Sequence, residues 1–341
     1  MYRSPAILNA QCSMLNAQKQ PGLTLGMGHC ALSISLVAAA CGGATVRLPE
    51  RPPTATQLSE LWIDPGPTPR DTCHGIGGTQ YAPQPDALYV FDAKDETGFS
   101  ASYDVVGPDG TEWSAKIGPE AQTEVVVSHL LWGLGYHQPP VYYLPKWQVR
   151  MADGTINMES EARFRPKLRF LERQTEYWTW HESPFLGTHP LNGLLVILLM
   201  LNGTDLKSDN NSTYVLSKPW DGAGRWFVVR DVGAALGETG TLFPRRNWLE
   251  GFEEEGFIEH VENGRIEFAY RGRHQELLDV ITPADVHWAA QRLQRLTERQ
   301  WRDAFRCANY ADPIAERYIR RITQKITDGL ALKVDARIEG R

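Results

Sequence analysis

The sequence predicts an α+β fold in which a small antiparallel sheet with one helix precedes a larger, mainly helical part. Short runs of β-forming residues separated by turn residues fill the first half of the chain. Helices with readable N-terminal caps fill the last part of the chain. The chain has 341 residues, of which 42% are hydrophobic and 22% are charged, so it is long and apolar enough to bury a sizeable core.

The overall charge limits the classes of partner. The formal net charge is −6, and Lys and Arg are scattered apart from a modest cluster in the C-terminal helices. Because phosphate backbones bind basic surfaces, we do not expect nucleic acid to be a partner.

The N-terminal segment 1–41 contains a short apolar run, "HCALSISLVAAACGG", in which small residues precede Cys41. It resembles a bacterial lipoprotein signal, whose cysteine is lipidated and becomes the mature N-terminus. The resemblance implies export to the periplasm or cell surface, with the membrane reached only through a lipid on Cys41. Met27 could also be the true start, which would explain the first 26 residues; the alternative to a signal is a disordered N-terminus or a wrong gene start, and a cytoplasmic protein.

The positions of the cysteines and histidines indicate whether a disulfide or a zinc site is expected. Three of the five cysteines lie in the leader, so export leaves Cys73 and Cys307 as an even pair in an oxidising compartment. The sequence leaves open whether these two form a disulfide or stay as buried thiols. The nine histidines stand singly, without the spacing of a zinc site.

Residues 42–86 are rich in Pro and Gly and are predicted to be an extended linker or a segment that wraps around the fold. Residues 87–175 follow as a sheet with one helix. Its first three strands, "ALYVFDAKD", "SASYDVVG" and "TEWSAKIG", are predicted to form a meander whose second turn is Pro-Asp-Gly. A helix in "GPEAQTEVVVSHLLWGLGY" comes next, with Pro119 in its first turn. Further strands are expected in "PVYYL", "KWQVRM" and "ARFRPKLRFL".

Residues 176–333 are predicted to be mainly helical. The run "LNGLLVILLML" is apolar on every side, which is typical of a buried helix. Two strands, "STYVL" and "RWFVVRD", follow it, and then an irregular stretch, "FPRRNWLEGFEEEGF". Three capped helices begin near Thr282, Thr297 and Asp312, and residues 334–341 form a tail.

Polar residues stand at four points of this scaffold: at the end of the third strand, on the next helix, after the buried helix and after the second strand of the hairpin. The stretches are "WSAKIG", "TEVVVSHLL", "DLKSDNN" and "VVRDVGAALG". Their order resembles the protein-kinase-like superfamily over about residues 87–330. The strongest part is Asp205-x-Lys207-x-x-Asn210, which has the catalytic-loop spacing of Ser/Thr kinases.

Three departures move the resemblance away from ordinary Ser/Thr kinases. Gly203-Thr204 replaces the usual His-Arg, "KDETGFSAS" has one glycine where a glycine-rich loop is expected, and no Ala-Pro-Glu follows. The chain is therefore closer to HipA-type kinases, lipid kinases and secretory-pathway kinases.

The resemblance implies a two-lobed fold that binds ATP and Mg²⁺ and transfers the γ-phosphate to an unidentified acceptor. Lys116 would hold the α- and β-phosphates, and Glu124 would fix its ammonium. We prefer Glu124 to Glu120 because a carboxylate in the first helical turn commonly only offsets the helix dipole. Asp205 would accept the proton of the acceptor hydroxyl, and Lys207 would contact the γ-phosphate. Asn210 and Asp231 would bind the metal.

Two other classes of protein compete with an active kinase. ATP is scarce outside the cytoplasm, so a catalytically inactive kinase-fold lipoprotein could bind a nucleotide or a partner in its interlobe cleft. Retention of Lys116, Asp205, Asn210 and Asp231 together argues against an inactive copy. A structural envelope protein is suggested only by the tryptophans, which are usually core residues.

Overall fold

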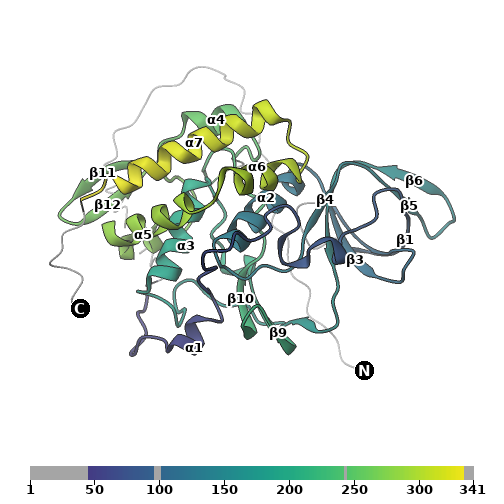
Figure 1. Ribbon diagram of the computed structural model, residues 1–341, viewed down its shortest axis with the longest axis horizontal. Coiled ribbons are helices and arrows are strands. Elements are labelled where there is room, and N and C mark those ends of the chain that lie inside the picture. Colours follow the sequence, from purple (N-terminus) through teal and green to yellow (C-terminus); the bar gives the residue numbers. More distant parts are fainter. Residues whose placement is uncertain (1–44, 96–100, 242–243, 334–341) are drawn as a thin grey trace, which may run out of the picture. The chain divides into compact units, whose positions relative to one another are not determined.

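The computed structural model describes residues 45–95, 101–241 and 244–333. Three regions named above lie outside the described residues: the leader with Cys41, the turn around Gly98 and the tail 334–341. Within them, the chain forms a seven-stranded sheet, two smaller sheets and several helices (Figure 1). The mixed α+β architecture predicted from the sequence is confirmed.

The seven-stranded sheet has the order β4-β7-β3-β2-β1-β5-β6. Its strands are β1 (Leu88–Asp95), β2 (Ser102–Val106), β3 (Glu112–Ile117), β4 (Tyr142–Leu144), β5 (Trp147–Arg150), β6 (Ile156–Glu159) and β7 (Ala162–Pro166). The predicted meander of β1, β2 and β3 is confirmed, and β7 extends it beyond β3. The pairing of β1 with β5 is parallel, which local turn signals do not predict.

One side of this sheet buries a cluster of aromatic residues, among them Tyr89, Trp113, Trp147 and Phe164. Alternation along β3 places Trp113 and Ala115 in this cluster and turns Ser114 and Lys116 to the opposite face. Gly118, with a φ of 125°, then lets the chain turn sharply from β3 into helix α2 (Glu120–Gly133). The end of β3 is thereby held next to the first turns of α2.

Residues 45–86 contact the rest of the chain at several points. Helix α1 (Ala55–Leu58) begins with a capping box at Thr54, and Leu61 just after it is fully buried. Two short 3₁₀ helices, η1 (Gly75–Gly77) and η2 (Thr79–Tyr81), follow. The segment between them and α1 is attached by a disulfide from Cys73 to Cys307, whose Cα atoms are 5.2 Å apart.

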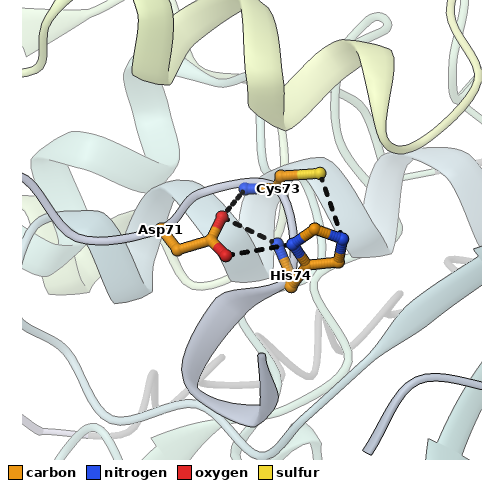
Figure 2. A group of neighbouring side chains, drawn as sticks. All are labelled: Asp71, Cys73 and His74. Carbon is orange, nitrogen blue, oxygen red and sulfur yellow. Dashed lines mark hydrogen bonds and ion pairs between the residues drawn. The ribbon is translucent and has the colours of Figure 1, made fainter. Parts of the chain in front are cut away.

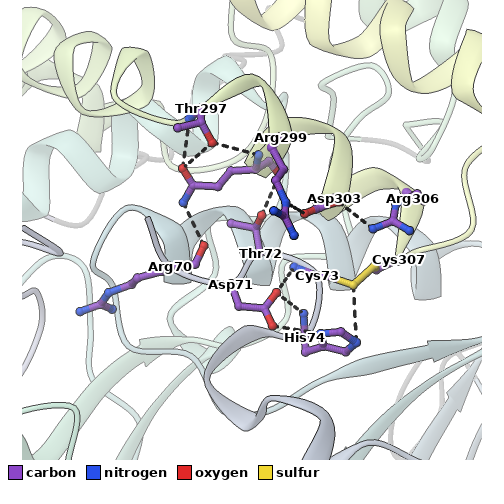
Figure 3. A network of polar contacts seen from close by, with 11 residues as sticks. Arg70, Asp71, Thr72, Cys73, His74, Thr297, Arg299, Asp303, Arg306 and Cys307 are labelled. Atoms are coloured by element: carbon purple, nitrogen blue, oxygen red, sulfur yellow. Dashed lines mark hydrogen bonds and ion pairs between the residues drawn. A yellow bond between two sulfur atoms is a disulfide. The ribbon is translucent and has the colours of Figure 1, made fainter. Parts of the chain in front are cut away.

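Hydrogen bonds reinforce this attachment to helix α6 (Glu298–Arg306), as Figure 3 shows. The Thr72 hydroxyl donates to the carbonyl of Gln300 at 2.7 Å, and the Gln300 side chain donates to the carbonyl of Arg70 at 3.0 Å. The described part of residues 42–86 is therefore bound to the fold by one covalent and several polar contacts.

The helices of the second half surround one buried helix, α3 (His189–Met200), whose N-cap is Thr188. Helix α3 packs on α5 (Pro283–Gln294), and α5 packs on α7 (Asp312–Leu330), the long helix drawn in yellow in Figure 1. The helix start predicted at Thr282 and the capping box predicted at Thr297 are confirmed, and Thr282 also forms a capping box. The apolar run is buried because it lies in the large hydrophobic cluster, to which α2, α5 and α7 also contribute residues.

The stretch predicted to be irregular has more regular structure than expected. It contains α4 (Leu249–Glu254), and the hairpin of β11 (Ile258–Glu262) and β12 (Arg265–Phe268) follows, leading to η4 (Gln275–Val280). Asn263 and Gly264 both have positive φ and form its two-residue turn. Asn-Gly is a strong hairpin signal in a sequence, and it was overlooked.

A three-stranded sheet combines strands from both halves of the sequence. It consists of β8 (Leu171–Arg173), β9 (Asn211–Trp220) and β10 (Ala223–Val229) in the order β10-β9-β8. Its last registered pair, Val229 with Asn211, sets residues 210 and 230 side by side at the end of the hairpin. None of the described helices combines the length and the apolarity needed to cross a bilayer.

Candidate functional site

Lys116 lies among three carboxylates. Its Nζ is 2.8 Å from Oε2 of Glu120, 3.5 Å from Oε2 of Glu124 and 4.0 Å from Oδ1 of Asp231. Three separate elements supply these groups: the end of β3, the first turns of α2 and the residues after β10. The Asp231 side chain is 38% exposed, so its carboxylate is accessible to a ligand.

Glu124 is the buried centre of this group. Its side chain is fully buried, and its Oε1 is 2.9 Å from Nε of Arg163 and 2.9 Å from Nη2 of Arg165. Burial alone would raise the pKa of Glu124, but the charges of Arg163, Lys116, Arg165 and Arg230 outweigh it and lower the pKa to about 2. The carboxylate therefore stays ionised and can fix the cations around it.

The loop after α3 forms a second polar group. Lys207 Nζ is 3.0 Å from Oδ2 of Asp205, and the Asn210 side chain donates to the Asp205 carbonyl at 2.9 Å. Residues 208–210 form a single 3₁₀ turn, η3 (Ser208–Asn210), which leads straight into β9. This turn places Asn210 directly beside the backbone of Asp205.

Backbone hydrogen bonds connect the two polar groups. The amide of Arg230 donates to the carbonyl of Asn210 at 2.9 Å, and the amide of Thr204 donates to the carbonyl of Ala234 at 2.9 Å. The segment with Asp205 therefore runs beside the segment with Asp231. Side-chain contacts join Lys116, Glu124 and Asp231, whereas the backbone links Asp205, Lys207 and Asn210 to them.

A pocket of ≈ 620 Å³ adjoins the Lys116 group. Its lining includes Ser114, which is two residues before Lys116 on the same face of β3, and Arg230, which directly precedes Asp231. Residues 165–169, β8 and Tyr214 of β9 also contribute. The pocket is thus formed jointly by the seven-stranded and the three-stranded sheets.

Sequence reasoning missed several charged residues of this region. Glu120, assigned to the helix dipole, pairs with Lys116 and with Arg246. Arg163 and Arg165 are both buried on β7. The alternation in "ARFRP" puts these two arginines on one face of a predicted strand, and buried arginines require a carboxylate partner.

Two kinds of residue could hold a cation at the predicted site. Asp231 offers a carboxylate and Asn210 an amide oxygen, which are the oxygen donors that Mg²⁺ prefers. The Asn210 amide nitrogen is already bonded to Asp205, which leaves its oxygen for another partner. These residues therefore fit a magnesium ion.

Two further clusters contain metal-ligand side chains. In the first, Asp71 Oδ2 is 3.0 Å from His74 Nδ1, and Cys73 Sγ is 3.6 Å from His74 Nε2 (Figure 2). The disulfide to Cys307 removes the thiolate that a metal would need. This cluster therefore does not fit a metal site.

The second cluster brings together His181, His274 and Glu276, whose ligand atoms all lie within 4.8 Å of one another. Glu276 Oε1 is 2.9 Å from Nε2 of His181 and 3.0 Å from Nδ1 of His274. Two imidazoles and a carboxylate form a donor set that zinc-like cations accept. Sequence spacing could not reveal it, because His181 and His274 are far apart in the chain.

No protein-family model matches the chain, and no curated protein sequence matches it. Among solved structures, it is similar to the crystal structure of a proinflammatory kinase, CtkA, from Helicobacter pylori. That similarity covers 73% of this chain and 100% of the kinase, with 10% identity and a TM-score of 0.35. A TM-score this low does not establish a common fold.

Proposed function

We propose that the protein is a phosphotransferase of two-lobed protein-kinase-like fold that binds ATP and Mg²⁺ and phosphorylates a hydroxyl group of an acceptor. One observation carries the proposal. Lys116, Glu124 and Asp231 meet beside a pocket, and the Asp205–Asn210 loop is hydrogen-bonded to the segment that carries Asp231. Phosphoryl transfer requires such a convergence, because it depends mainly on positioning and on neutralising phosphate charge.

The two-lobed arrangement is supported by the hydrophobic clusters. The aromatic cluster of the seven-stranded sheet is separate from the large cluster around α3. The ≈ 620 Å³ pocket takes lining residues both from β3 and β7 and from β8 and β9. A cleft between two independently packed parts is a common place for a ligand site.

In the proposed reaction the residues have distinct roles. Lys116 binds phosphate oxygens, and Glu124, locked by its arginines, holds the lysine in place. Asp205 accepts the proton of the acceptor hydroxyl while its oxygen forms the new bond to the γ-phosphorus and the bond to the β-phosphate oxygen breaks. Lys207, paired with Asp205 at 3.0 Å, offsets negative charge near the transferring group. Asp231 and Asn210 would hold Mg²⁺, which would supply charge neutralisation.

An inactive module that binds a nucleotide or a partner is the second candidate. It is favoured because both Lys116 and Asp205 already have ion-pair partners within the protein. Lys116 lies closer to Glu120, at 2.8 Å, than to Asp231, at 4.0 Å, and Asp205 is paired with Lys207. A protein that uses the cleft only for binding can keep these pairs permanently closed.

Calorimetric titration of ATP with Mg²⁺ tests the binding common to both candidates. We expect binding to the wild type and loss of it in Asp231→Asn. The matched control is Asp209→Asn, an exposed carboxylate in the same loop, which should bind as the wild type does. Absence of binding to the wild type would exclude the phosphotransferase and the nucleotide-binding form of the inactive module, and would leave only a module that binds another partner.

Phosphate transfer then separates the two candidates. With labelled ATP and a panel of hydroxyl acceptors, we expect transfer that Asp205→Asn abolishes while ATP binding is retained. Binding without transfer to any acceptor of the panel would favour the inactive module.

We also propose that the protein is exported and anchored through a lipid on Cys41. The disulfide between Cys73 and Cys307 supports this, since disulfides persist in oxidising compartments. An inhibitor of lipoprotein signal peptidase should cause the unprocessed precursor to accumulate, and Cys41→Ser should abolish lipid labelling. A full-length cytoplasmic product without the inhibitor would contradict export.

A further inference from the structure

The pocket beside Lys116 is dominated by positive charge. Two glutamates, Glu112 and Glu172, face five cationic side chains in its lining: Arg165, Lys167, Arg169, Arg173 and Arg230. Lys167 already has a partner in Asp104 at 2.6 Å, so the arginines are the cations that matter most. Such a lining differs from the usual small-molecule pocket, which is mainly apolar with a few polar groups.

Two of these arginines have unused donors. Arg165 is 5% exposed and donates from Nη2 to Glu124 at 2.9 Å. Among the residues that the structure describes, its Nε and Nη1 and the Nε of Arg230 have no hydrogen-bond partner. A buried donor without a partner costs about 1–3 kcal/mol, and more for a charged group. An anion in the pocket would supply the missing acceptors.

The charges around Glu124 also leave a positive excess. Glu124 is shared by Arg163 and Arg165 at 2.9 Å each, whereas Lys116, at 3.5 Å, has its nearest partner in Glu120. Burial is the largest cause that lowers the pKa of Arg165 to about 9, and repulsion by the guanidinium groups of Arg230 and Arg163 adds to it. A bound anion relieves this repulsion.

The cationic surface is continuous with the Lys116 group. Arg230 directly precedes Asp231, whose carboxylate is 4.0 Å from Lys116. Arg173 donates from Nε to the hydroxyl of Ser212, on the strand that pairs with β10. A phosphate at Lys116 and an anionic group at Arg165, Arg173 and Arg230 can therefore belong to one extended ligand.

Resting on the proposed phosphotransferase function, we infer that this pocket binds a second anionic portion of the phosphoryl donor, so that a linear inorganic polyphosphate chain binds better than ATP. The terminal phosphoryl group lies near Asp205 and Lys207, the next phosphates lie at Lys116, and the phosphates beyond them lie along the arginines. In transfer, the bond from the acceptor oxygen to the terminal phosphorus forms and the bond from that phosphorus to the bridging oxygen breaks. The hydroxyl proton goes to Asp205, and the bridging oxygen leaves on a chain that is one phosphate shorter.

Titration calorimetry with inorganic polyphosphate and with ATP, each with Mg²⁺, tests the inference on the wild type. We expect a lower Kd for polyphosphate. Arg173→Gln and Arg230→Gln should weaken polyphosphate binding about tenfold or more, because each removes a charge-assisted hydrogen bond. ATP binding should weaken less, because the triphosphate is shorter than the polyphosphate chain and reaches fewer of these arginines. The matched control is Arg225→Gln on β10, because Arg225 does not line this pocket.

The possible results separate this inference from the proposed function. If ATP binds more tightly than polyphosphate, or the two arginine variants leave polyphosphate binding unchanged, the inference is wrong and the phosphotransferase stands. If neither compound binds the wild type, both are wrong. Circular dichroism of each variant identifies any loss of binding that comes from misfolding. If a variant misfolds, the salt dependence of polyphosphate binding to the wild type is measured instead. Several phosphate contacts make the Kd rise steeply with salt concentration, whereas a single contact gives a shallow rise.

Discussion

Two fully buried charges, Glu124 beside the cleft and Lys325 in the helical core, have opposite surroundings. Glu124 touches three cations and keeps its charge, with a pKa of about 2. Lys325, on α7, donates to the side-chain oxygen of Asn202 and lies 4.5 Å above the ring of Phe252. Burial and the charge of Arg321 lower its pKa to about 7, against weaker effects of Glu255 and Asp328.

The difference shows what each region is built to do. Around Glu124, compensating charges keep an ionised group in place, which is useful where charge must be presented to a ligand. Around Lys325, a neutral amide and an aromatic ring accept the amine but do not balance its charge. The cleft region therefore preserves charge, and the helical core suppresses it.

The largest expected effect comes from Glu124→Gln. It leaves Arg163, Arg165 and Lys116 without their shared carboxylate, so the free energy of unfolding should fall by about 3–5 kcal/mol. Urea unfolding monitored by circular dichroism measures this. A loss below about 1 kcal/mol would mean that the three cations do not depend on Glu124 and would remove the contrast with Lys325.

The same variant tests the acid side of the pH profile. The folded-state pKa of Glu124, about 2, lies below its ordinary value of 4.5, so its stabilisation is complete above pH 4.5 and is lost as the pH falls toward 2. We therefore expect the free energy of unfolding of Glu124→Gln to fall less than that of the wild type as the pH is lowered from 4.5 to 2. Parallel profiles for the two proteins between pH 2 and 4.5 would contradict the assignment.

An intermediate effect is expected for Lys325→Met. The folded-state pKa of Lys325, about 7, lies below the ordinary 10.5, so the wild type should gain stability as the pH rises between these values. Between pH 7 and pH 9 the gain from this group is roughly 2 kcal/mol. Urea unfolding at both pH values should show the gain in the wild type and not in the variant. An equal gain in both proteins would show that Lys325 is charged in the fold.

The smallest expected effect on stability comes from Asp205→Asn. The Asp205 side chain is 20% exposed and its partner Lys207 is 36% exposed, so the ion pair contributes about 0.2–1 kcal/mol. Urea unfolding should place this variant close to the wild type, although we expect phosphate transfer to be lost. A destabilisation as large as that of Glu124→Gln would give Asp205 a structural role instead.

Local signals in the sequence predicted much of the fold. The Pro-Asp-Gly turn, the apolar run of α3 and the caps at Thr282 and Thr297 each depend on neighbouring residues. The parallel pairing of β1 with β5 depends on the tertiary arrangement and could not be predicted. The hairpin at Asn263-Gly264 was predictable in principle and was missed.

For the candidate site, the residue types and their order could be read from the sequence, but their partners could not. The contact between Lys116 and Asp231 joins residues far apart in the chain. Arg163 and Arg165 became relevant only because β7 pairs with β3 and turns both toward Glu124. The His181, His274 and Glu276 cluster likewise exists only in the folded chain.

The disulfide between Cys73 and Cys307 closes a covalent ring whose ends are 234 positions apart. Lys116, Asp205 and Asp231 all lie within that ring. A protease that cuts one exposed loop inside it opens the ring without releasing a fragment, so the nicked protein migrates as one species until a reductant is added. Cleavage by itself therefore does not shed the candidate site from the rest of the molecule.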